Sequence, residues 1–360
     1  MSIHFHKLAV KEIRRETPEC VSVLFEIPEE IKKDFAFQHG QSLTMRTFLN
    51  GEEVRRTYSI CASPLDDEWR VAIKRHDGGL FSGFANEHLK EGDVLEVMQP
   101  VGKFFTDLDP QQKNSYVAFA AGSGITPVIS IIKTTLRKER KSQFTLVYGN
   151  RTKNSIIFKE ELEGLKDKFI DRFRIIHILS RERTDALINS GRIDLNKLND
   201  LNKLINYKDS DEFFICGPEE MIFCVKDFLE NNGIEKKKIH FELFTTPGEN
   251  RKSEVNSQKL KVKKEGPTSK ISVKLDGITF DFDLGFNGES ILNAALKQGA
   301  DLPYACKGGV CCTCKARLIE GEVEMDVHWG LEEEEVQQGY ILTCQSHPKT
   351  EKVVVDFDVK

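Results

Sequence analysis

A chain of 360 residues is long enough for two or three domains, and its 39% hydrophobic and 30% charged residues are typical of a globular protein. The formal net charge of −5 at pH 7 is mild and gives no reason to expect a nucleic acid as a partner. No apolar run approaches the length of a membrane span, and the first residues lack the long apolar core of a secretory signal, so we expect neither a membrane protein nor a secreted one.

Residues 1–108 have the pattern of an antiparallel β-barrel. Segments that alternate between apolar and polar residues, such as 22–27 and 68–73, are separated by turns of Gly, Pro and Asp. Short strands at this density predict a barrel. One helix is expected within it, over residues 80–89, where two glycines precede the first helical residue.

Two stretches of this barrel combine groups that bind phosphate with groups that contact an aromatic ring. Arg56 has the charge to neutralise a phosphate, while Tyr58 could stack on a flavin ring and Ser59 could hydrogen-bond to it. The free N–H groups at the glycine-opened helix start, near Ser82, suit a flavin pyrophosphate and hence FAD. Both stretches also fit plainer interpretations, an ordinary β-strand and an ordinary helix cap. The candidate flavin contacts are Arg56, Thr57, Tyr58, Ser59, Ile73, Lys74, Gly79, Leu80, Phe81 and Ser82.

Residues 109–246 alternate between strand and helix signals. The first strand signal is a short and entirely apolar run, as in a buried parallel strand, and a helical pattern follows over residues 128–137. This alternation predicts a doubly wound α/β domain. The strand signals lie at residues 116–121, 144–148, 173–179 and 212–216.

Turns at the expected edge of this sheet have the composition of a dinucleotide site. Gly122 and Gly124 would let a dinucleotide approach the backbone, although the stretch is not G-x-G-x-x-G. Cys216 is either a small buried hydrophobic residue or a thiol beside a nicotinamide. Arg181 could bind a 2′-phosphate and so favour NADPH, but an exposed arginine is usually only solvated. The candidate nucleotide contacts are Gly122, Gly124, Thr126, Pro127, Ser180, Arg181, Cys216, Gly217 and Pro218.

The α/β region ends with a short segment and a linker. Glu242 and Phe244 either belong to a last core strand or place a carboxylate and an aromatic ring at the flavin face. Residues 247–268 are polar, basic at a net +3 and short of large apolar side chains, which indicates a flexible linker. Residues 269–360 are the acidic part of the chain, at a net −7.

Four cysteines near the C-terminal end have the spacing of an iron–sulfur site. Cys306, Cys311 and Cys314 read C-x4-C-x2-C, and Cys344 follows after 29 intervening residues, which is the plant-type spacing for a [2Fe–2S] cluster. Structural zinc, the alternative, usually takes two close pairs of ligands, whereas the fourth cysteine stands alone here. Cys312 is then a neighbour of the cluster and not a ligand. Nine cysteines with four committed to metal argue against disulfides and for a cytoplasmic location.

Taken in order, these motifs resemble the ferredoxin–NADP reductase superfamily with a plant-type ferredoxin added at the C-terminal end. The stretches around Tyr58, Cys216 and Glu242 resemble its flavin motif, its nicotinamide-side turn and its terminal motif. The resemblance implies a multidomain α+β oxidoreductase whose last domain, residues 269–360, has the β-grasp fold. It also implies FAD, NADPH and a [2Fe–2S] cluster as cofactors, with Ser59, Cys216 and Glu242 in catalytic positions beside the flavin.

The same resemblance implies a protein partner that receives the electrons. We expect an oxygenase component, most specifically a di-iron oxygenase acting on an acyl-CoA substrate, and neither a nucleic acid nor a membrane. A reductase for a ring-hydroxylating dioxygenase would share every motif, and a general diaphorase or ferric reductase would need no dedicated partner. A redox sensor that is not an enzyme would not need the complete nucleotide site.

Overall fold

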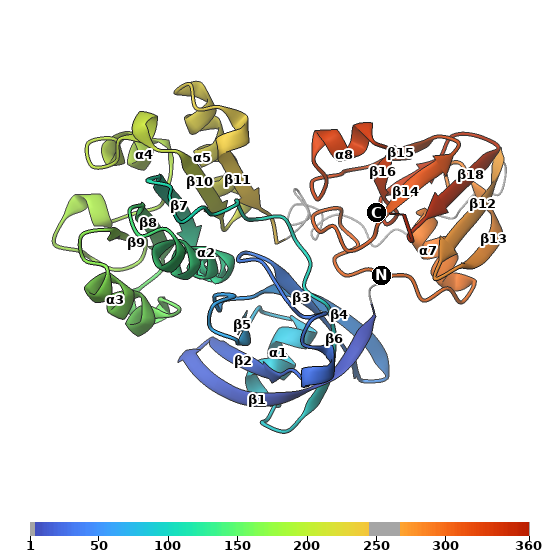
Figure 1. The fold of residues 1–360 in the computed structure, drawn as a ribbon, viewed down its shortest axis with the longest axis horizontal. Coiled ribbons are helices and arrows are strands. Elements are labelled where there is room, and N and C mark those ends of the chain that lie inside the picture. The colour runs from blue at the N-terminus through green and yellow to red at the C-terminus, as the bar shows by residue number, and fades with distance from the viewer. Residues whose placement is uncertain (1–3, 245–266, 360) are drawn as a thin grey trace. The chain divides into compact units, whose positions relative to one another are not determined.

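The computed structural model describes residues 4–244 and 267–359. They belong to two compact units, His6–Leu243 and a second unit that combines residues 4–5 with the chain from Phe244 onward, and each unit is described by itself (Figure 1). The linker expected over residues 247–268 lies outside the described residues, except for Pro267 and Thr268. In the described part of the chain no helix is long and apolar enough to cross a membrane.

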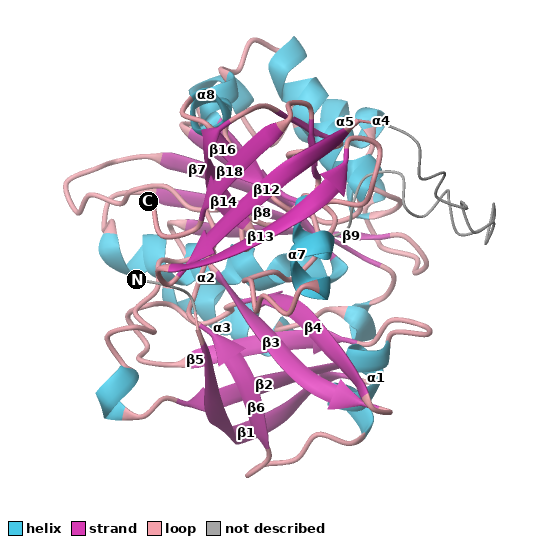
Figure 2. Ribbon diagram, turned by 90° about the vertical axis from the view of Figure 1, so that its right-hand side faces the viewer, coloured by secondary structure: helices cyan, strands magenta, loops and turns pink. Residues whose placement is uncertain are grey.

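The N-terminal part of the first unit is an antiparallel β domain, as predicted. Its six strands lie in the order β4-β3-β6-β1-β2-β5, and an isolated bridge between Ile60 and Val71 links the end of β4 to β5 (Figure 2). Fully buried aliphatic side chains fill the interior, each contributing about 1.5–3 kcal/mol. The elements are β1 (Phe5–Thr17), β2 (Cys20–Glu26), β3 (Ser42–Leu49), β4 (Glu52–Ser59), β5 (Trp69–Lys74), α1 (Leu80–Glu87) and β6 (Val94–Met98), with a 3₁₀ turn at Glu29–Ile31.

The rest of this unit is a doubly wound α/β domain, also as predicted. Its sheet has the order β11-β10-β7-β8-β9 with every neighbouring pair parallel, so the chain reverses its direction of winding between β7 and β10. Ligands of such sheets bind at the carboxyl ends of the strands at this switch point. The elements are β7 (Ser115–Ala121), α2 (Ile125–Lys138), β8 (Gln143–Asn150), α3 (Lys159–Lys168), β9 (Phe173–Leu179), α4 (Leu195–Leu201), β10 (Glu212–Cys216), α5 (Glu219–Asn231) and β11 (Ile239–Glu242), with 3₁₀ turns at Gly122–Gly124, Lys153–Ser155, Leu187–Asn189, Tyr207–Asp209 and Lys236–Lys238.

Two helices differ from their predicted bounds for local reasons. The helix expected at residues 128–137 begins at Ile125, because the 3₁₀ turn Gly122–Gly124 runs directly into it. Pro127 sits in its first turn, where the missing N–H leaves no partner unsatisfied. The helix expected at 80–89 ends at Glu87, and His88 departs from helical geometry.

The second unit contains a five-stranded mixed sheet in the order β13-β12-β18-β14-β16, in which β12 and β18 are parallel. Helix α7 is capped by Ser290, whose hydroxyl accepts from the Asn293 N–H, and its apolar residues pack with those of the sheet. This arrangement confirms the expected ferredoxin fold. The elements are β12 (Thr268–Leu275), β13 (Ile278–Gly285), α7 (Ile291–Lys297), β14 (Lys315–Glu320), β15 (Val323–Met325), α8 (Glu333–Gln337), β16 (Tyr340–Leu342), β17 (Ser346–Pro348) and β18 (Lys352–Asp356).

Candidate functional site

The three candidate catalytic residues come together where the barrel meets the parallel sheet. Ser59 ends β4, Cys216 ends β10 and Glu242 ends β11. The Ser59 hydroxyl donates to Oε2 of Glu242 at 3.1 Å although the two residues are 183 positions apart. Cys216 is the direct neighbour of Glu242 in the β10–β11 ladder. Two strands of one domain and one strand of the other thus supply a single site.

Partial exclusion of water sets the electrostatics of this site. The Cys216 and Ser59 side chains are buried, and Glu242 is half-buried. Loss of water around the Glu242 carboxyl raises its pKa to about 7, and the hydrogen bond from Ser59 opposes part of that rise. Burial and the nearby Glu242 carboxyl together raise the pKa of the Cys216 thiol well above its ordinary value. A proton can therefore be held on Glu242 near neutral pH, while Cys216 stays a neutral thiol.

The start of α1 has the geometry that the flavin phosphate prediction needs. The N-cap residue is Gly79, which has no side chain. The N-cap residue therefore makes no side-chain hydrogen bond to the backbone N–H groups of the first helical turn. Ser82 belongs to the turn itself: its hydroxyl accepts from the His76 N–H at 3.1 Å and donates to the Gly79 carbonyl at 3.3 Å. Leu80, the first helical residue, is about half exposed. Backbone N–H groups are thus what this helix start offers to an anion, next to a turn that the Ser82 hydrogen bonds hold in place.

An aromatic pair stands next to this helix start. The rings of Tyr58 and Phe81 are 5.6 Å apart between centroids and tilted by 34°. Burial raises the pKa of the Tyr58 hydroxyl, against the opposing effect of the Arg56 charge. The Arg56 guanidinium donates to the Arg55 carbonyl at 2.7 Å. Phe81 is buried in the barrel core and Tyr58 is half-buried beside it, so Tyr58 is the ring of this pair that a ligand could contact.

The other flavin candidates divide into core and edge positions. Ile73 is fully buried in the barrel core, so its side chain is not available to a ligand. Thr57 shares a 3.0 Å hydroxyl–hydroxyl bond with Thr44 of β3. Lys74 Nζ reaches across to the other domain, where it would lie 3.8 Å from a Cβ atom on Gly122. Lys74 is thus the flavin candidate that also faces the nucleotide loop.

Two backbone turns meet closely at the switch point of the parallel sheet. A Cβ atom on Gly124 would lie 2.0 Å from the Cys216 carbonyl oxygen, so only glycine fits there. The Tyr148 hydroxyl donates to the Gly122 carbonyl at 3.0 Å, and the Thr126 hydroxyl donates to the Ser123 carbonyl at 3.1 Å. The first turn of α2 and the start of α5 therefore lie side by side, with Gly217 and Pro218 leading into α5 and Pro127 buried in α2.

Two arginines extend from neighbouring strand ends of the same sheet. The backbone N–H of Arg181 donates to the Arg151 carbonyl at 2.8 Å, and the backbone N–H of Ser180 donates to the Asn150 carbonyl at 2.9 Å. Both arginine side chains are exposed. Arg151 was not among the residues predicted from the sequence. The signal that could have found it is its position one residue past β8, beside the strand that ends before Ser180.

Phe244 is 42% exposed and belongs to the second compact unit, whereas Glu242 belongs to the first. The place of Phe244 at the flavin face therefore stays a prediction.

The predicted cluster ligands form two pairs of thiols. Cys311 and Cys306 Sγ are 3.1 Å apart, and Cys314 is hydrogen-bonded to Cys344. Among the described residues, no three metal-binding side chains surround a single point. A [2Fe–2S] cluster distributes its four ligands over two irons, so two pairs fit it.

The backbone of the cluster loop favours anionic sulfur. The Gly308 N–H donates to Cys306 Sγ at 3.3 Å, and hydrogen bonds from the Cys311 thiol and from this N–H lower the pKa of Cys306. Gly309 has φ +72°, and a Cβ atom on it would lie 2.9 Å from the Val327 carbonyl oxygen. The loop is thus held against the 327–330 segment, where the Gly330 N–H donates to the Gly309 carbonyl at 2.9 Å.

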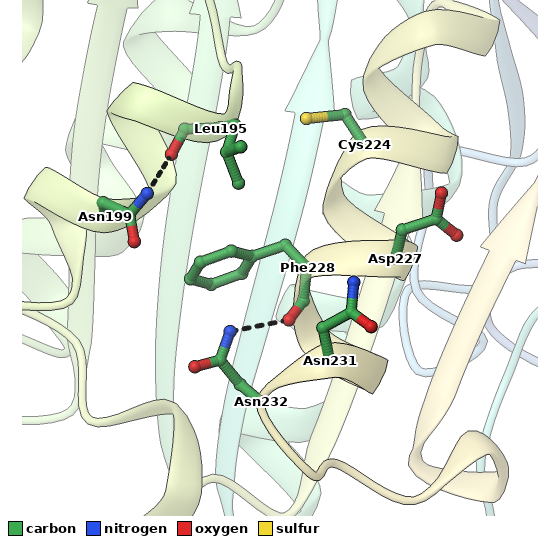
Figure 3. Close-up of a pocket in the computed structure, with 7 residues that line it drawn as sticks. All are labelled: Leu195, Asn199, Cys224, Asp227, Phe228, Asn231 and Asn232. Carbon is green, nitrogen blue, oxygen red and sulfur yellow. Dashed lines mark hydrogen bonds between the residues drawn. The ribbon is translucent and has the colours of Figure 1, made fainter.

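A separate pocket of roughly 400 Å³ lies between α4 and α5 (Figure 3). None of the predicted site residues lines it. Its walls are Leu195, Asn199, Cys224, Asp227, Phe228, Asn231 and Asn232.

Comparison with known proteins decides the family. Residues 7–105 match the oxidoreductase FAD-binding domain, residues 119–227 the oxidoreductase NAD-binding domain, and residues 273–349 the 2Fe-2S iron-sulfur cluster binding domain. The chain is 46% identical over 357 residues to one of the subunits of the 1,2-phenylacetyl-CoA epoxidase of Escherichia coli, in an alignment that covers 99% of this chain and 98% of that protein. It belongs to the ferredoxin–NADP reductase-like flavoproteins that end in a [2Fe–2S] ferredoxin domain.

Other relatives of this reductase are more distant. The ferredoxin reductase component of 3-ketosteroid-9-alpha-monooxygenase from Rhodococcus rhodochrous is 31% identical over 353 residues, covering 97% of this chain and 96% of that protein. Among solved structures, phthalate dioxygenase reductase has the same fold with a TM-score of 0.59 and 24% identity, covering 98% of both chains.

The family confirms the predicted cofactors at the level of NAD(P)H, FAD and a [2Fe–2S] cluster, and it confirms an oxidoreductase of the kind that serves multicomponent oxygenases. It thereby decides against structural zinc and against a sensor without enzymatic activity. When bound, these cofactors convert the two-electron chemistry of NAD(P)H into single-electron transfer. The roles of individual residues stay predictions.

Proposed function

We propose that the reductase draws electrons from NADPH and passes them singly to a di-iron oxygenase that epoxidises an aromatic acyl-CoA thioester, such as phenylacetyl-CoA, in phenylacetate breakdown. The observation that carries this proposal is the 46% identity, over nearly the whole of both chains, to a component of 1,2-phenylacetyl-CoA epoxidase. The relative from the 3-ketosteroid monooxygenase has 31% identity over a similar length.

Ser59, Cys216 and Glu242 are the proposed catalytic residues. The bond from Ser59 to Glu242 fixes the direction of the hydroxyl, and the raised pKa of Glu242 lets the pair hold or release one proton near neutral pH. Cys216, buried and neutral, would contact the nicotinamide without adding charge. The Gly124–Cys216 backbone contact supports this placement, because it brings the nucleotide turn against the strand end that carries the thiol.

NADPH is proposed over NADH because two guanidinium groups, those of Arg151 and Arg181, lie at adjacent strand ends. A guanidinium binds phosphate with a planar fork of donors. The plainer alternative, two solvated arginines, is tested below.

The ferredoxin domain is proposed to dock on a basic surface of the oxygenase. Residues 269–360 have a net charge of −7, and Glu332, Glu333 and Glu334 are exposed at the start of α8. Complementary charge mainly raises the rate of encounter, so electron delivery to the oxygenase should slow as salt shortens the Debye length, which is roughly 8 Å at 0.15 M. We place this reaction in the cytoplasm, where the thiols remain reduced.

The test combines the reductase, the candidate epoxidase, NADPH and phenylacetyl-CoA. We expect a substrate-dependent epoxide that increases with reductase concentration. A second candidate function, delivery to a ring-hydroxylating dioxygenase, uses the same three domains. Failure to support the epoxidase together with active support of a dioxygenase would establish that second function instead.

A further inference from the structure

Helix α2 presents polar side chains in a part of the protein that is almost free of water. It leads away from the proposed nucleotide turn, and nearly every residue of its first three turns is buried. Ser130 and Thr134 are nevertheless polar, with 0% and 4% of their surface exposed. Together with Lys133 and Arg137 they follow the three- and four-residue spacing of a single helix face.

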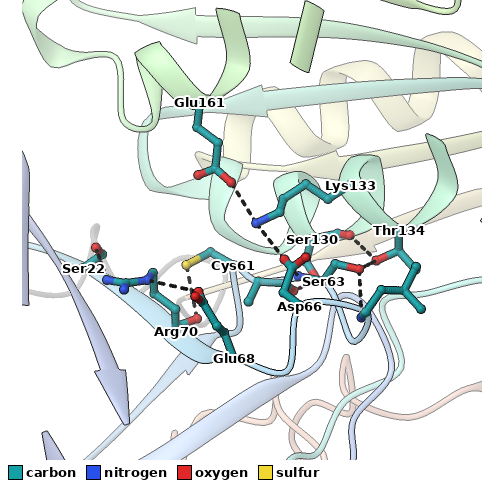
Figure 4. Close-up of polar contacts among 12 residues, drawn as sticks. Ser22, Cys61, Ser63, Asp66, Glu68, Arg70, Ser130, Lys133, Thr134 and Glu161 are labelled. Atoms are coloured by element: carbon teal, nitrogen blue, oxygen red, sulfur yellow. Dashed lines mark hydrogen bonds and ion pairs between the residues drawn. The ribbon is translucent and has the colours of Figure 1, made fainter. Parts of the chain in front are cut away.

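This face packs against the loop that joins β4 to β5 of the flavin barrel (Figure 4). The Ser130 hydroxyl donates to the Ala62 carbonyl at 2.6 Å. The hydroxyls of Ser63 and Thr134 are 2.9 Å apart. Ser130 and Thr134 are thus paired with the other domain and are not left unsatisfied in a core. We call these contacts, with those of Asp66 below, the α2 seam.

Asp66 is the central charge of the α2 seam. Its carboxylate accepts from the Ser63 N–H at 2.8 Å and from Lys133 Nζ at 3.0 Å, and it also pairs with the Arg137 guanidinium. Lys133 in turn pairs with Glu161 of α3 at 2.7 Å. Asp66 therefore joins the barrel loop to α2, and Lys133, which pairs with both Asp66 and Glu161, extends the connection to α3.

The α2 seam is close in sequence to both halves of the proposed active site. Ser63 and Asp66 follow Ser59 by only four and seven residues. At the other end, Gly124 precedes Ser130 along the same helical segment. A close-packed protein interior transmits displacements, and the α2 face that carries Ser130 and Thr134 is buried in such an interior. A shift at the seam would therefore move the nucleotide turn relative to Ser59.

We propose that Asp66 is a positioning residue for the reaction between NAD(P)H and FAD. By holding α2 to the β4–β5 loop it fixes the distance between the nucleotide turn and the flavin strand. Partly buried ion pairs often contribute less to net stability than to the selection of one arrangement. An error of about 1 Å in reactant placement can cost roughly 100-fold in rate. The inference rests on the proposed nucleotide turn and not on the identity of the oxygenase.

The test compares Asp66→Asn with Asp67→Asn, which changes the adjacent residue in the same way. Asp67 pairs with Lys32 at 2.7 Å, within the barrel domain, and its φ of +53° is one that asparagine tolerates. Anaerobic stopped-flow absorbance measures flavin reduction by NADPH, and titration with NADP⁺ measures the nicotinamide–flavin charge-transfer band. Ferricyanide serves as the acceptor in steady-state assays.

We expect Asp66→Asn to slow flavin reduction by about 10- to 100-fold and to weaken the charge-transfer band, with KM for NADPH changed by less than about twofold. Asp67→Asn should match the wild type, and Asp66→Glu should recover part of the rate. Wild-type rates and a wild-type band in Asp66→Asn would overturn the proposal, as would an equal loss in Asp67→Asn.

A second variant keeps the test decisive if Asp66→Asn does not fold. Thr134→Val removes the hydroxyl contact with Ser63, together with a bond to the Ser130 carbonyl inside α2, and leaves Asp66 in place; it should weaken the charge-transfer band in the same direction. An unchanged band in that case contradicts the proposal. NADP⁺ binding separates this proposal from the assignment of the nucleotide turn. If both are right, Asp66→Asn binds NADP⁺ as the wild type does, and a substitution of Thr126 weakens binding. If the turn is misassigned, a substitution of Thr126 leaves NADP⁺ binding unchanged.

Discussion

The proposed flavin–nicotinamide site and the cluster loop differ in how far apart their residues lie in the sequence. Ser59 and Glu242, joined by a hydrogen bond, are 183 residues apart and come from two different domains. Three of the four cluster cysteines lie within nine residues, on a loop shaped by its own glycines. The first site therefore depends on how domains pack, and the second on local backbone geometry and ligand chemistry. Substitutions in one of these two sites should therefore leave the other site intact.

The largest expected effect is loss of the cluster on removal of a ligand. Cys311→Ser should abolish or grossly perturb the cluster, because a hydroxyl is a poor substitute for the thiolate paired with Cys306. Iron and sulfide analysis measures this, and flavin content and NADPH–ferricyanide activity should persist. The matched control is Cys312→Ser, one residue away. If Cys312→Ser also lost the cluster, the ligand assignment would be wrong.

The next largest effect is expected at the packed site. Ser59→Ala removes the hydroxyl that donates to Glu242, and we expect flavin reduction by NADPH to slow by about 10²–10³-fold. Stopped-flow absorbance gives the rate, while iron content should remain at the wild-type value. Ser63→Ala, four residues on, is a less severe comparison because it alters the α2 seam and leaves the Ser59–Glu242 bond in place. Equal rates in Ser59→Ala and wild type would remove Ser59 from the catalytic set.

The Glu242 carboxyl should make stability depend on pH. The unfolded chain releases its proton near pH 4.5, whereas the folded protein keeps it up to about pH 7. Because the folded state binds more protons in this window, stability falls as pH rises through it. Between pH 5 and pH 8 the loss should reach at most about 3 kcal/mol.

Glu242→Gln should remove this component. The melting temperatures of the wild-type and Glu242→Gln holoproteins are measured at pH 5 and pH 8. Comparing the two pH-dependent changes cancels the contribution of the titratable groups that both proteins share. A wild type that loses no more stability than Glu242→Gln over this range would show that the carboxyl is ionised at pH 7.

The smallest effect concerns nucleotide choice. Arg181→Ala should raise KM for NADPH about tenfold, the equivalent of about 1.4 kcal/mol, with little change for NADH. Arg140→Ala, another exposed arginine near the end of α2, is the control. A wild type that prefers NADH in kcat/KM would refute the assignment.

Sequence patterns predicted what is local in this protein. The spacing of Cys306, Cys311 and Cys314 identifies its site because the residues are near neighbours, and the apolar run that forms β7 identified a buried parallel strand. The glycine-opened start of α1 was visible for the same reason. In each case a few consecutive residues determine the geometry.

What the sequence did not predict depends on contacts between distant segments. Nothing in the residues around Ser59 indicates that its hydroxyl donates a hydrogen bond to Glu242. Likewise, nothing around Arg151 indicates that Arg181, which follows β9, lies beside it. The polar face of α2 was equally invisible, because Ser130 and Thr134 are satisfied only by the barrel loop. Long-range pairing has to be observed in the fold.

The order in which NADPH reduces the two redox centres tests the central claim most directly. In an anaerobic single-turnover mixing experiment, absorbance and electron paramagnetic resonance distinguish the flavin from the cluster. We predict that the flavin is reduced first and the cluster afterwards, and that Cys344→Ser shows the first phase without the second. Reduction of the cluster before the flavin, or a reduced flavin that never passes electrons to an intact cluster, would contradict this account.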